Sequence, residues 1–115
     1  MKIKTERLNH TIQIELSIII MREVKNELVK SISITGVETT NDLSYSKVYY
    51  IIRDIDKRKQ VEEALEKTSS FIRTKLAEKI NIRTTPKLVF QYDTSIEYGE
   101  HIEKIMSEIK EKENQ

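Results

Sequence analysis

A chain of 115 residues with a formal net charge of +1 is long enough for one domain with a modest core. It contains no cysteine, which excludes a disulfide scaffold, a cysteine zinc site and a thiol nucleophile. Its longest apolar run, residues 18–21, is too short to cross a bilayer and no signal-peptide pattern opens the chain, so we expect a cytoplasmic protein with one domain over residues 1–110 and a frayed tail over residues 111–115.

The small net charge conceals an uneven distribution along the chain. Lysine and arginine outnumber aspartate and glutamate by 9 to 4 over residues 57–92, whereas the acidic residues outnumber the basic ones by 7 to 3 over residues 93–115. A local excess of positive charge attracts polyanions. A solvated helix face has the same composition, so charge alone leaves both interpretations open.

Residues 5–30 form the first expected element. Their isoleucines and leucines fit both strand alternation and a helical stripe, so periodicity does not decide between the two. The stretch has no glycine or proline and is too long for an ordinary strand, which predicts one long helix. Two antiparallel strands are expected next, one over residues 32–37 with a bulge at Gly36 and one over residues 47–52, joined by the turn residues 39–42.

The second helical region is expected to contain a kink. Asp56 is predicted to cap it, and its buried stripe begins at Val61. The three short polar residues Thr68, Ser69 and Ser70 then predict a kink or a break between two helices, because their hydroxyls compete for backbone carbonyls. An unbroken helix with a polar patch is the alternative.

Pro86 separates this helical region from a short strand. It has no N–H and disfavours helical geometry at the preceding residue, so the helix must end upstream. Leu88 and Phe90 alternate as a buried strand requires, and both are expected in the core. Thr94 or Ser95 is expected to cap a last helix, along which five apolar residues keep helical spacing: Ile96, Ile102, Ile105, Met106 and Ile109.

The expected order is helix, strand, strand, helix, kink, helix, strand, helix. It predicts an α+β sandwich in which helices pack on one face of a three-stranded sheet. Two motifs occur in this order along the chain. The first is Asp42-Leu43 followed by Lys47-Val48-Tyr49, and the second is R-x-x-P-x-L-x-F-x-x-D from Arg83 to Asp93, preceded by Phe71-Ile72-Arg73.

On these residues the chain resembles the ribosome-binding factor A family, bacterial ribosome-maturation factors with a type II KH-like fold. It departs from the family where Thr68-Ser69-Ser70 replace an Ala-x-Gly kink, and it lacks the Asp-Pro that often ends the first helix, near residues 26–29. The resemblance implies a non-enzymatic, monomeric factor without a cofactor. Such a factor binds the free small (30S) ribosomal subunit and its 16S rRNA during late assembly and supports 5′-end processing of that rRNA.

The residues expected to contact RNA are cations around the second half of the helix pair and two serines at the kink, where a helix N-terminus would offer N–H groups to phosphate. They are Arg73, Lys75, Lys79, Arg83, Lys87, Ser69 and Ser70. No G-x-x-G loop is present, so recognition of folded rRNA by shape and charge is favoured over clamping of single-stranded RNA in the usual KH manner.

Other roles and other classes of protein remain open. Arg83 pairing with Asp93 across the strand is the alternative to an RNA role, and Asp42 and Asp93 fit turn or cap positions better than acid–base chemistry. His10 and His101 show no ligand spacing, so no metal site is expected. The competing classes are a protein-interaction module that uses the tyrosine-rich hairpin and the acidic last helix, and a hydrolase or nuclease that depends on Asp42 and Asp93.

Overall fold

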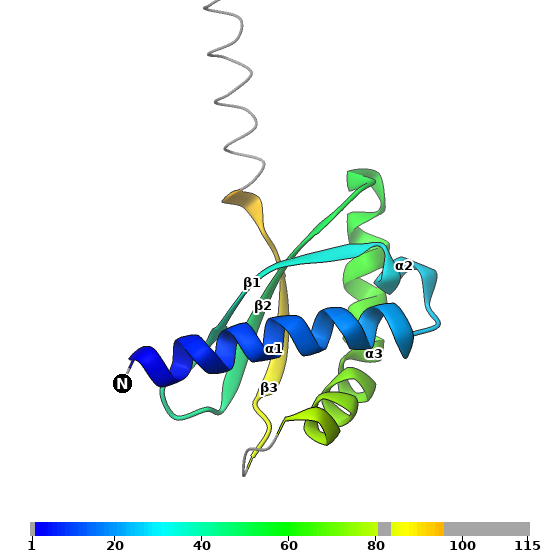
Figure 1. The fold of residues 1–115 in the computed structure, drawn as a ribbon. Coiled ribbons are helices and arrows are strands. Elements are labelled where there is room, and N and C mark those ends of the chain that lie inside the picture. Colours follow the sequence, from blue (N-terminus) through cyan, green and yellow to red (C-terminus); the bar gives the residue numbers. More distant parts are fainter. Residues whose placement is uncertain (1, 81–83, 96–115) are drawn as a thin grey trace, which may run out of the picture.

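A three-stranded sheet with helices against one face forms the body of the molecule (Figure 1). The structure, a computed structural model, describes residues 2–80 and 84–95. The elements are α1 (Lys2–Arg22), α2 (Glu27–Lys30), β1 (Ile32–Thr39), β2 (Tyr45–Ile52), the short 3-10 helix η1 (Ile55–Lys57), α3 (Arg58–Lys79) and β3 (Lys87–Tyr92). The predicted α+β class is confirmed, whereas the last predicted helix lies, beyond Ser95, outside the described residues.

β2 is the central strand of the sheet, since the strand order is β1-β2-β3. It pairs antiparallel with β1 and parallel with β3, so the connection from β2 to β3 is a crossover that α3 supplies. The pairing register slips between Ile34 and Gly36, which confirms the predicted bulge. β2 begins at Tyr45, two residues earlier than expected.

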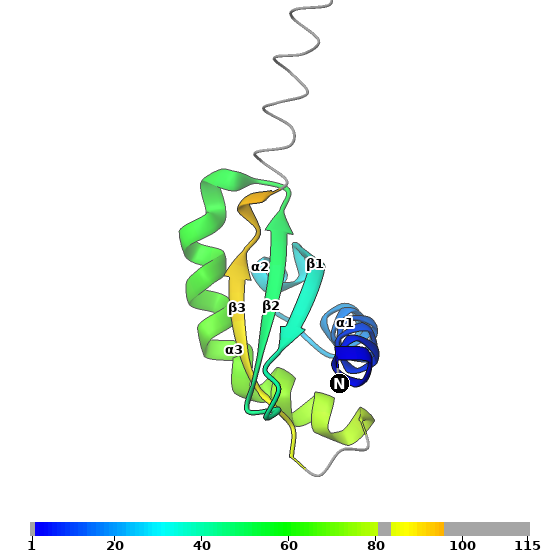
Figure 2. The ribbon, with the colours of Figure 1, turned by 90° about the vertical axis from the view of Figure 1, so that its left-hand side faces the viewer.

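The two faces of the sheet differ in burial. Ser46, Val48 and Tyr50 of β2 are at most 1% exposed, and their alternate neighbours Tyr45 and Lys47 are exposed. Because successive strand residues point to opposite faces, the helices cover one face only. Within the described part of the chain nothing covers the other, which we call the open face, and Figure 2 looks onto it with α2 behind the strands.

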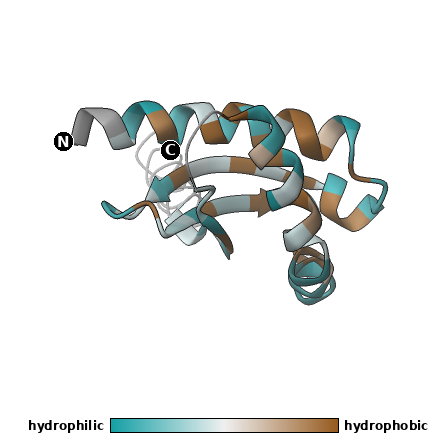
Figure 3. Ribbon diagram, turned by 90° about the horizontal axis from the view of Figure 1, so that it is seen from below, coloured by the Kyte–Doolittle hydropathy of each residue, from teal (hydrophilic) through white to brown (hydrophobic). Residues whose placement is uncertain are grey.

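Isoleucine and leucine side chains from the helices fill the core against the covered face. Hydrophobic positions recur along α1 in Figure 3, and five isoleucine and leucine residues of α1 and α3 are 0% exposed: Ile12, Leu16, Ile19, Ile72 and Leu76. Each such burial stabilises the fold by about 1.5–3 kcal/mol. Leu88 is buried as predicted, and Phe90 is half-buried against the same core.

The prediction of one helix over residues 5–30 is wrong. α1 ends at Arg22, and a separate short helix, α2, follows after four residues. The Asn26 side chain accepts hydrogen bonds from the backbone N–H groups of Leu28 (2.9 Å) and Val29 (3.3 Å), which is the geometry of a helix N-cap. Asn26 therefore begins a new helix where propensity alone favours continuation.

Among the described residues, no helix has the length and apolar character needed to cross a membrane.

The predicted cap at Asp56 is also wrong. Asp54 is the capping residue, and its side chain accepts a hydrogen bond from the backbone N–H of Asp56 at 3.1 Å. Asp56 lies inside η1, and α3 begins at Arg58 without a side-chain cap. The helical turn thus starts two residues before the position that the sequence suggested, because both aspartates are competent caps and the upstream one is used.

Candidate nucleic-acid interface

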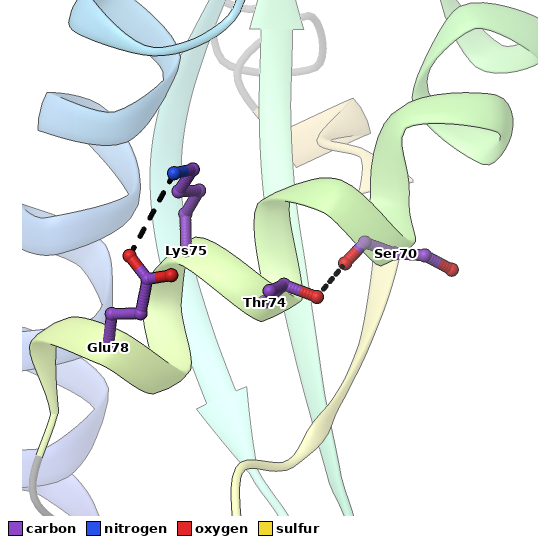
Figure 4. Close-up of polar contacts among 4 residues, drawn as sticks. All are labelled: Ser70, Thr74, Lys75 and Glu78. Atoms are coloured by element: carbon purple, nitrogen blue, oxygen red, sulfur yellow. Dashed lines mark hydrogen bonds and ion pairs between the residues drawn. The ribbon is translucent and has the colours of Figure 1, made fainter.

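α3 is a single helix that changes direction along its length (Figures 1 and 2), and Figure 4 shows Ser70 at the bend. The Thr68 hydroxyl donates to the carbonyl of Ala64 at 2.7 Å, and the Thr74 hydroxyl donates to the carbonyl of Ser70 at 2.9 Å (Figure 4). Hydroxyl groups that bond the carbonyl four residues earlier are a recognised cause of helix bending. The predicted kink is confirmed, whereas the predicted break into two helices is wrong.

Continuity of α3 removes one part of the predicted phosphate site. With no helix beginning near Ser69, there are no free N-terminal N–H groups at that position to bind phosphate. Ser69 instead lies with Glu62, Glu66 and Lys87 in a groove of about 500 Å³ between α3 and β3. The groove therefore has two carboxylates and one ammonium group in its lining, a balance of charge that does not favour a phosphate.

Arg73 joins the second half of α3 to the segment that leads into β3. Its Nη2 donates a hydrogen bond of 2.7 Å to the carbonyl of Thr85, and the next residue in the chain, Pro86, is fully buried. Lys87 follows two residues after Thr85 and is exposed. Arg73 and Lys87 thus lie at the same end of the sheet, whereas Arg83 lies outside the described residues.

Lys75 and Lys79 form a second pair of cations, one helical turn apart. The Nζ of Lys75 is 3.9 Å from a carboxylate oxygen of Glu78 (Figure 4) and 5.7 Å from the ring centroid of Phe71, which is 44% exposed. Residues two positions apart on a helix point about 200° apart, so Arg73 faces away from Lys75. The structure therefore divides the described cations into two pairs: Arg73 on one side of α3 with Lys87 at the start of β3, and Lys75 with Lys79 on another side of α3.

Arg58 is a further cation of α3, but its contacts hold it on the protein. Its Nε is 3.4 Å from a carboxylate oxygen of Glu62, and its guanidinium lies 4.4 Å from the ring centroid of Tyr92. The Tyr92 ring in turn meets that of Tyr50 edge-on, with centroids 5.9 Å apart. Arg58 thus fixes the start of α3 to the end of β3 rather than presenting a free charge.

The two aspartates considered as acid–base candidates have structural roles. Hydrogen bonds from the hydroxyls of Ser44 (2.6 Å) and Thr40 (2.8 Å) lower the pKa of Asp42 to about 2. The Ser95 and Thr35 hydroxyls lower the pKa of Asp93, which also accepts from the backbone N–H of Ser95 at 3.0 Å.

Residues 94 and 95 are already helical, and the side chain that accepts a hydrogen bond from the backbone N–H of Ser95 belongs to Asp93, so the predicted helix cap at Thr94 or Ser95 is wrong. Asp42 lies in the turn between β1 and β2, and Asp93 follows β3 at the other end of the sheet. They do not converge on one site. No cluster of three or more metal-ligating side chains occurs among the residues that the structure describes.

Comparison with known proteins gives one consistent result. A family model described as ribosome-binding factor A matches residues 4–106. A protein of Phytoplasma mali named ribosome-binding factor A is 44% identical over 112 residues, which cover 95% of this chain and 98% of that protein.

Solved structures agree on the fold. The crystal structure of ribosome-binding factor A from Thermus thermophilus is similar with a TM-score of 0.67 at 20% identity, covering 76% of this chain and 93% of that one. A homology model of the Thermus thermophilus factor, fitted into the cryo-EM map of a 30S–RbfA complex, gives a TM-score of 0.60 at 18% identity, covering 75% and 91%. These similarities confirm the predicted KH-like α+β fold.

Proposed function

The chain belongs to the ribosome-binding factor A family, and from that membership we propose that it binds the small ribosomal subunit through 16S rRNA during late assembly. The family match over residues 4–106 carries the proposal, and the 30S complex described for the Thermus thermophilus relative supports the choice of partner. In this role the protein is a cytoplasmic, non-catalytic monomer that supports 5′-end processing of the rRNA.

The cations of α3 and β3 supply the affinity in this proposal. Arg73 with Lys87 and Lys75 with Lys79 are two pairs of charges on one rigid helix–strand unit, and contacts from such side chains to phosphates position a protein on RNA without reading sequence. Because Arg73 faces away from Lys75 and Lys79 on α3, the two pairs fit a partner that surrounds the helix, such as a fold of rRNA. They fit a single flat surface less well.

Co-sedimentation with purified small subunits tests the proposal. We expect the charge reversals Arg73→Glu with Lys87→Glu, and Lys75→Glu with Lys79→Glu, each to weaken binding at least tenfold, because each pair removes two phosphate contacts and adds two repulsive charges. A matched control is Lys25→Glu with Lys30→Glu, which reverses two exposed lysines near the opposite end of the sheet.

The control variant is expected to bind as the wild type does. Circular dichroism and thermal unfolding show whether each variant is folded, which matters most for Arg73 because its bond to Thr85 is lost. Unchanged binding of both charge-reversed pairs, in folded proteins, would contradict the proposed contact surface. Absence of the wild type from the small-subunit fraction of a lysate gradient would contradict the proposed partner.

A further inference from the structure

The open face of the sheet carries two tyrosines of β2, each beside a lysine. Tyr45 is 49% exposed and lies directly opposite Lys87 of β3 in the pairing register. The Nζ of Lys47 is 6.0 Å from the ring centroid of Tyr49. Tyr45, Lys47 and Tyr49 alternate along β2 and therefore point to the same side, at steps of about 7 Å. The Lys47 ammonium group therefore lies in a row between the rings of Tyr45 and Tyr49, and the Lys87 ammonium group lies beside Tyr45.

Val89 extends this row into a surface. It lies opposite Lys47 on β3 and is 40% exposed, and Gln91 lies opposite Tyr49. No element among residues 2–80 and 84–95 packs over these side chains. Grouped aromatic and aliphatic side chains left in water on a small domain indicate a binding surface.

We propose that Tyr45, Lys47, Tyr49, Lys87 and Val89, which we call the tyrosine face, bind an unpaired segment of RNA. Bases stack on the two rings, and the phosphates between them lie beside the two lysines. Stacking on an aromatic side chain changes affinity by about 5- to 150-fold per base and tolerates any base, since each has a π-face. The inference rests on the proposed function only for the choice of rRNA as the natural source of the segment.

The composition of the tyrosine face favours single-stranded RNA over the alternatives. Duplex RNA keeps its bases stacked on each other, so tyrosine rings gain little from it. Protein interfaces are depleted of lysine at their centres, whereas Lys47 lies between the two tyrosines. A ring with a cation beside it suits a nucleotide, which combines a flat base with a charged phosphate.

Carboxylates limit the site on its β1 side and at one end. Glu38 lies opposite Lys47 on β1 and accepts a hydrogen bond of 3.3 Å from the Tyr49 hydroxyl, and Glu38, Tyr49 and Asp93 line a hollow of about 340 Å³. Glu38 therefore repels phosphate from the β1 side of the row, and Asp93 repels it beyond Tyr49. At the other end Lys87 is two residues from Thr85, to which Arg73 is bonded, so the RNA path continues from Tyr45 towards the Arg73–Lys87 pair.

Fluorescence anisotropy with a labelled, unstructured decamer of uridine and adenosine tests the inference on the full chain. We expect Tyr45→Ile with Tyr49→Ile to weaken binding at least tenfold, because isoleucine keeps strand propensity and apolar area but offers no ring. Tyr45→Phe with Tyr49→Phe keeps both rings and is expected to bind within threefold of the wild type.

Salt dependence tests the lysines separately. Each phosphate contact to a single strand contributes about 0.7 to the slope of log affinity against log salt, so Lys47→Gln with Lys87→Gln should reduce the slope by about 1.4. The proposal would be overturned if the isoleucine variant bound the decamer as tightly as the wild type does. It would also be overturned if the wild type bound the decamer and its duplex with equal affinity.

Co-sedimentation with small subunits separates this inference from the proposed function. If the isoleucine variant leaves decamer binding unchanged but loses the subunit, the tyrosine face binds a protein and the inference is wrong. If charge reversal on α3 abolishes subunit binding while decamer binding by the wild type does not depend on the tyrosines, the proposed function stands and the inference fails. A loss of decamer binding in the folded isoleucine variant alone, with the phenylalanine variant intact, supports it.

Discussion

The hydroxyl of Thr35 donates a hydrogen bond of 2.5 Å to a carboxylate oxygen of Asp93, which joins the bulge of β1 to the residue that follows β3. Since β2 lies between these strands, the bond spans the width of the sheet. The backbone N–H of Asp93 also donates to the carbonyl of Tyr50 in β2 at 2.8 Å. One aspartate therefore ties all three strands together at this end.

Replacing Thr35 by valine tests this tie. We expect Thr35→Val to lower the free energy of unfolding by about 1 kcal/mol at pH 7, the usual net value of one hydrogen bond. The pKa of Asp93 is held below its ordinary value of 3.8, so the stability that its ionised form contributes is present above pH 3.8 and is lost as the pH falls through the folded pKa. Urea denaturation at several pH values measures the difference, which should shrink below pH 3.8.

Thr39→Val is the matched control. Thr39 lies on the same strand as Thr35, and its hydroxyl bonds the Ser46 hydroxyl at 2.8 Å with no carboxylate involved. Its loss should have an effect of similar size that does not change between pH 7 and pH 3. Parallel pH dependence in the two variants would show that ionised Asp93 is not the acceptor that matters.

The hairpin turn offers a second test through Asp42. Its pKa is lowered to about 2, chiefly by the Ser44 hydroxyl and then by that of Thr40. Ser44→Ala should therefore raise the pKa of Asp42 towards 3.8, and carboxyl chemical shifts followed by NMR during an acid titration measure it directly. Ser33→Ala, a change on β1 away from the turn, should leave the titration as it is in the wild type.

Local signals made the strands predictable. The alternation along β2 and the glycine at position 36 each depend on residues close in sequence, and the structure confirms both the hairpin and the bulge. The parallel pairing of β3 with β2 depends on how the crossover through α3 is packed, and no pattern within β3 itself reports it. The bend of α3 was predictable from the polar residues Thr68 to Ser70. The continuity of α3 through the bend was not predictable, because the hydroxyl groups bond backbone carbonyls without interrupting the helix.

The candidate site was predicted less well, although the sequence held part of the answer. Arg73 and Lys75 are two positions apart, and residues at that spacing on a helix do not face each other. Lys47 and Tyr49 of the tyrosine face were readable as alternate residues of the predicted strand, but Tyr45 lay before its expected start. The partner on β3 was not readable, because Lys87 reaches Tyr45 only through the parallel pairing.

The separation of α1 from α2 predicts a measurable cap at Asn26. We expect Asn26→Ala to lower the free energy of unfolding by about 1 kcal/mol, since two backbone N–H groups lose the side-chain oxygen that satisfies them. Asn26→Asp keeps the acceptor and should retain most of the wild-type stability. Equal urea midpoints for the alanine and aspartate variants would show that the cap contributes nothing.

Leu43, in the hairpin turn, has a φ of 63°, a left-handed conformation that costs a leucine roughly 1–2 kcal/mol and that asparagine adopts more readily. Leu43→Asn should therefore raise the free energy of unfolding by about 0.5–1 kcal/mol, which corresponds to a thermal midpoint higher by several degrees. The comparison that isolates backbone strain is Leu43→Ala, because alanine removes the same half-buried side chain but keeps the penalty at positive φ. Calorimetry should place the asparagine variant above the alanine variant; equal midpoints would mean that the surrounding hairpin, and not residue 43, sets the stability of this turn.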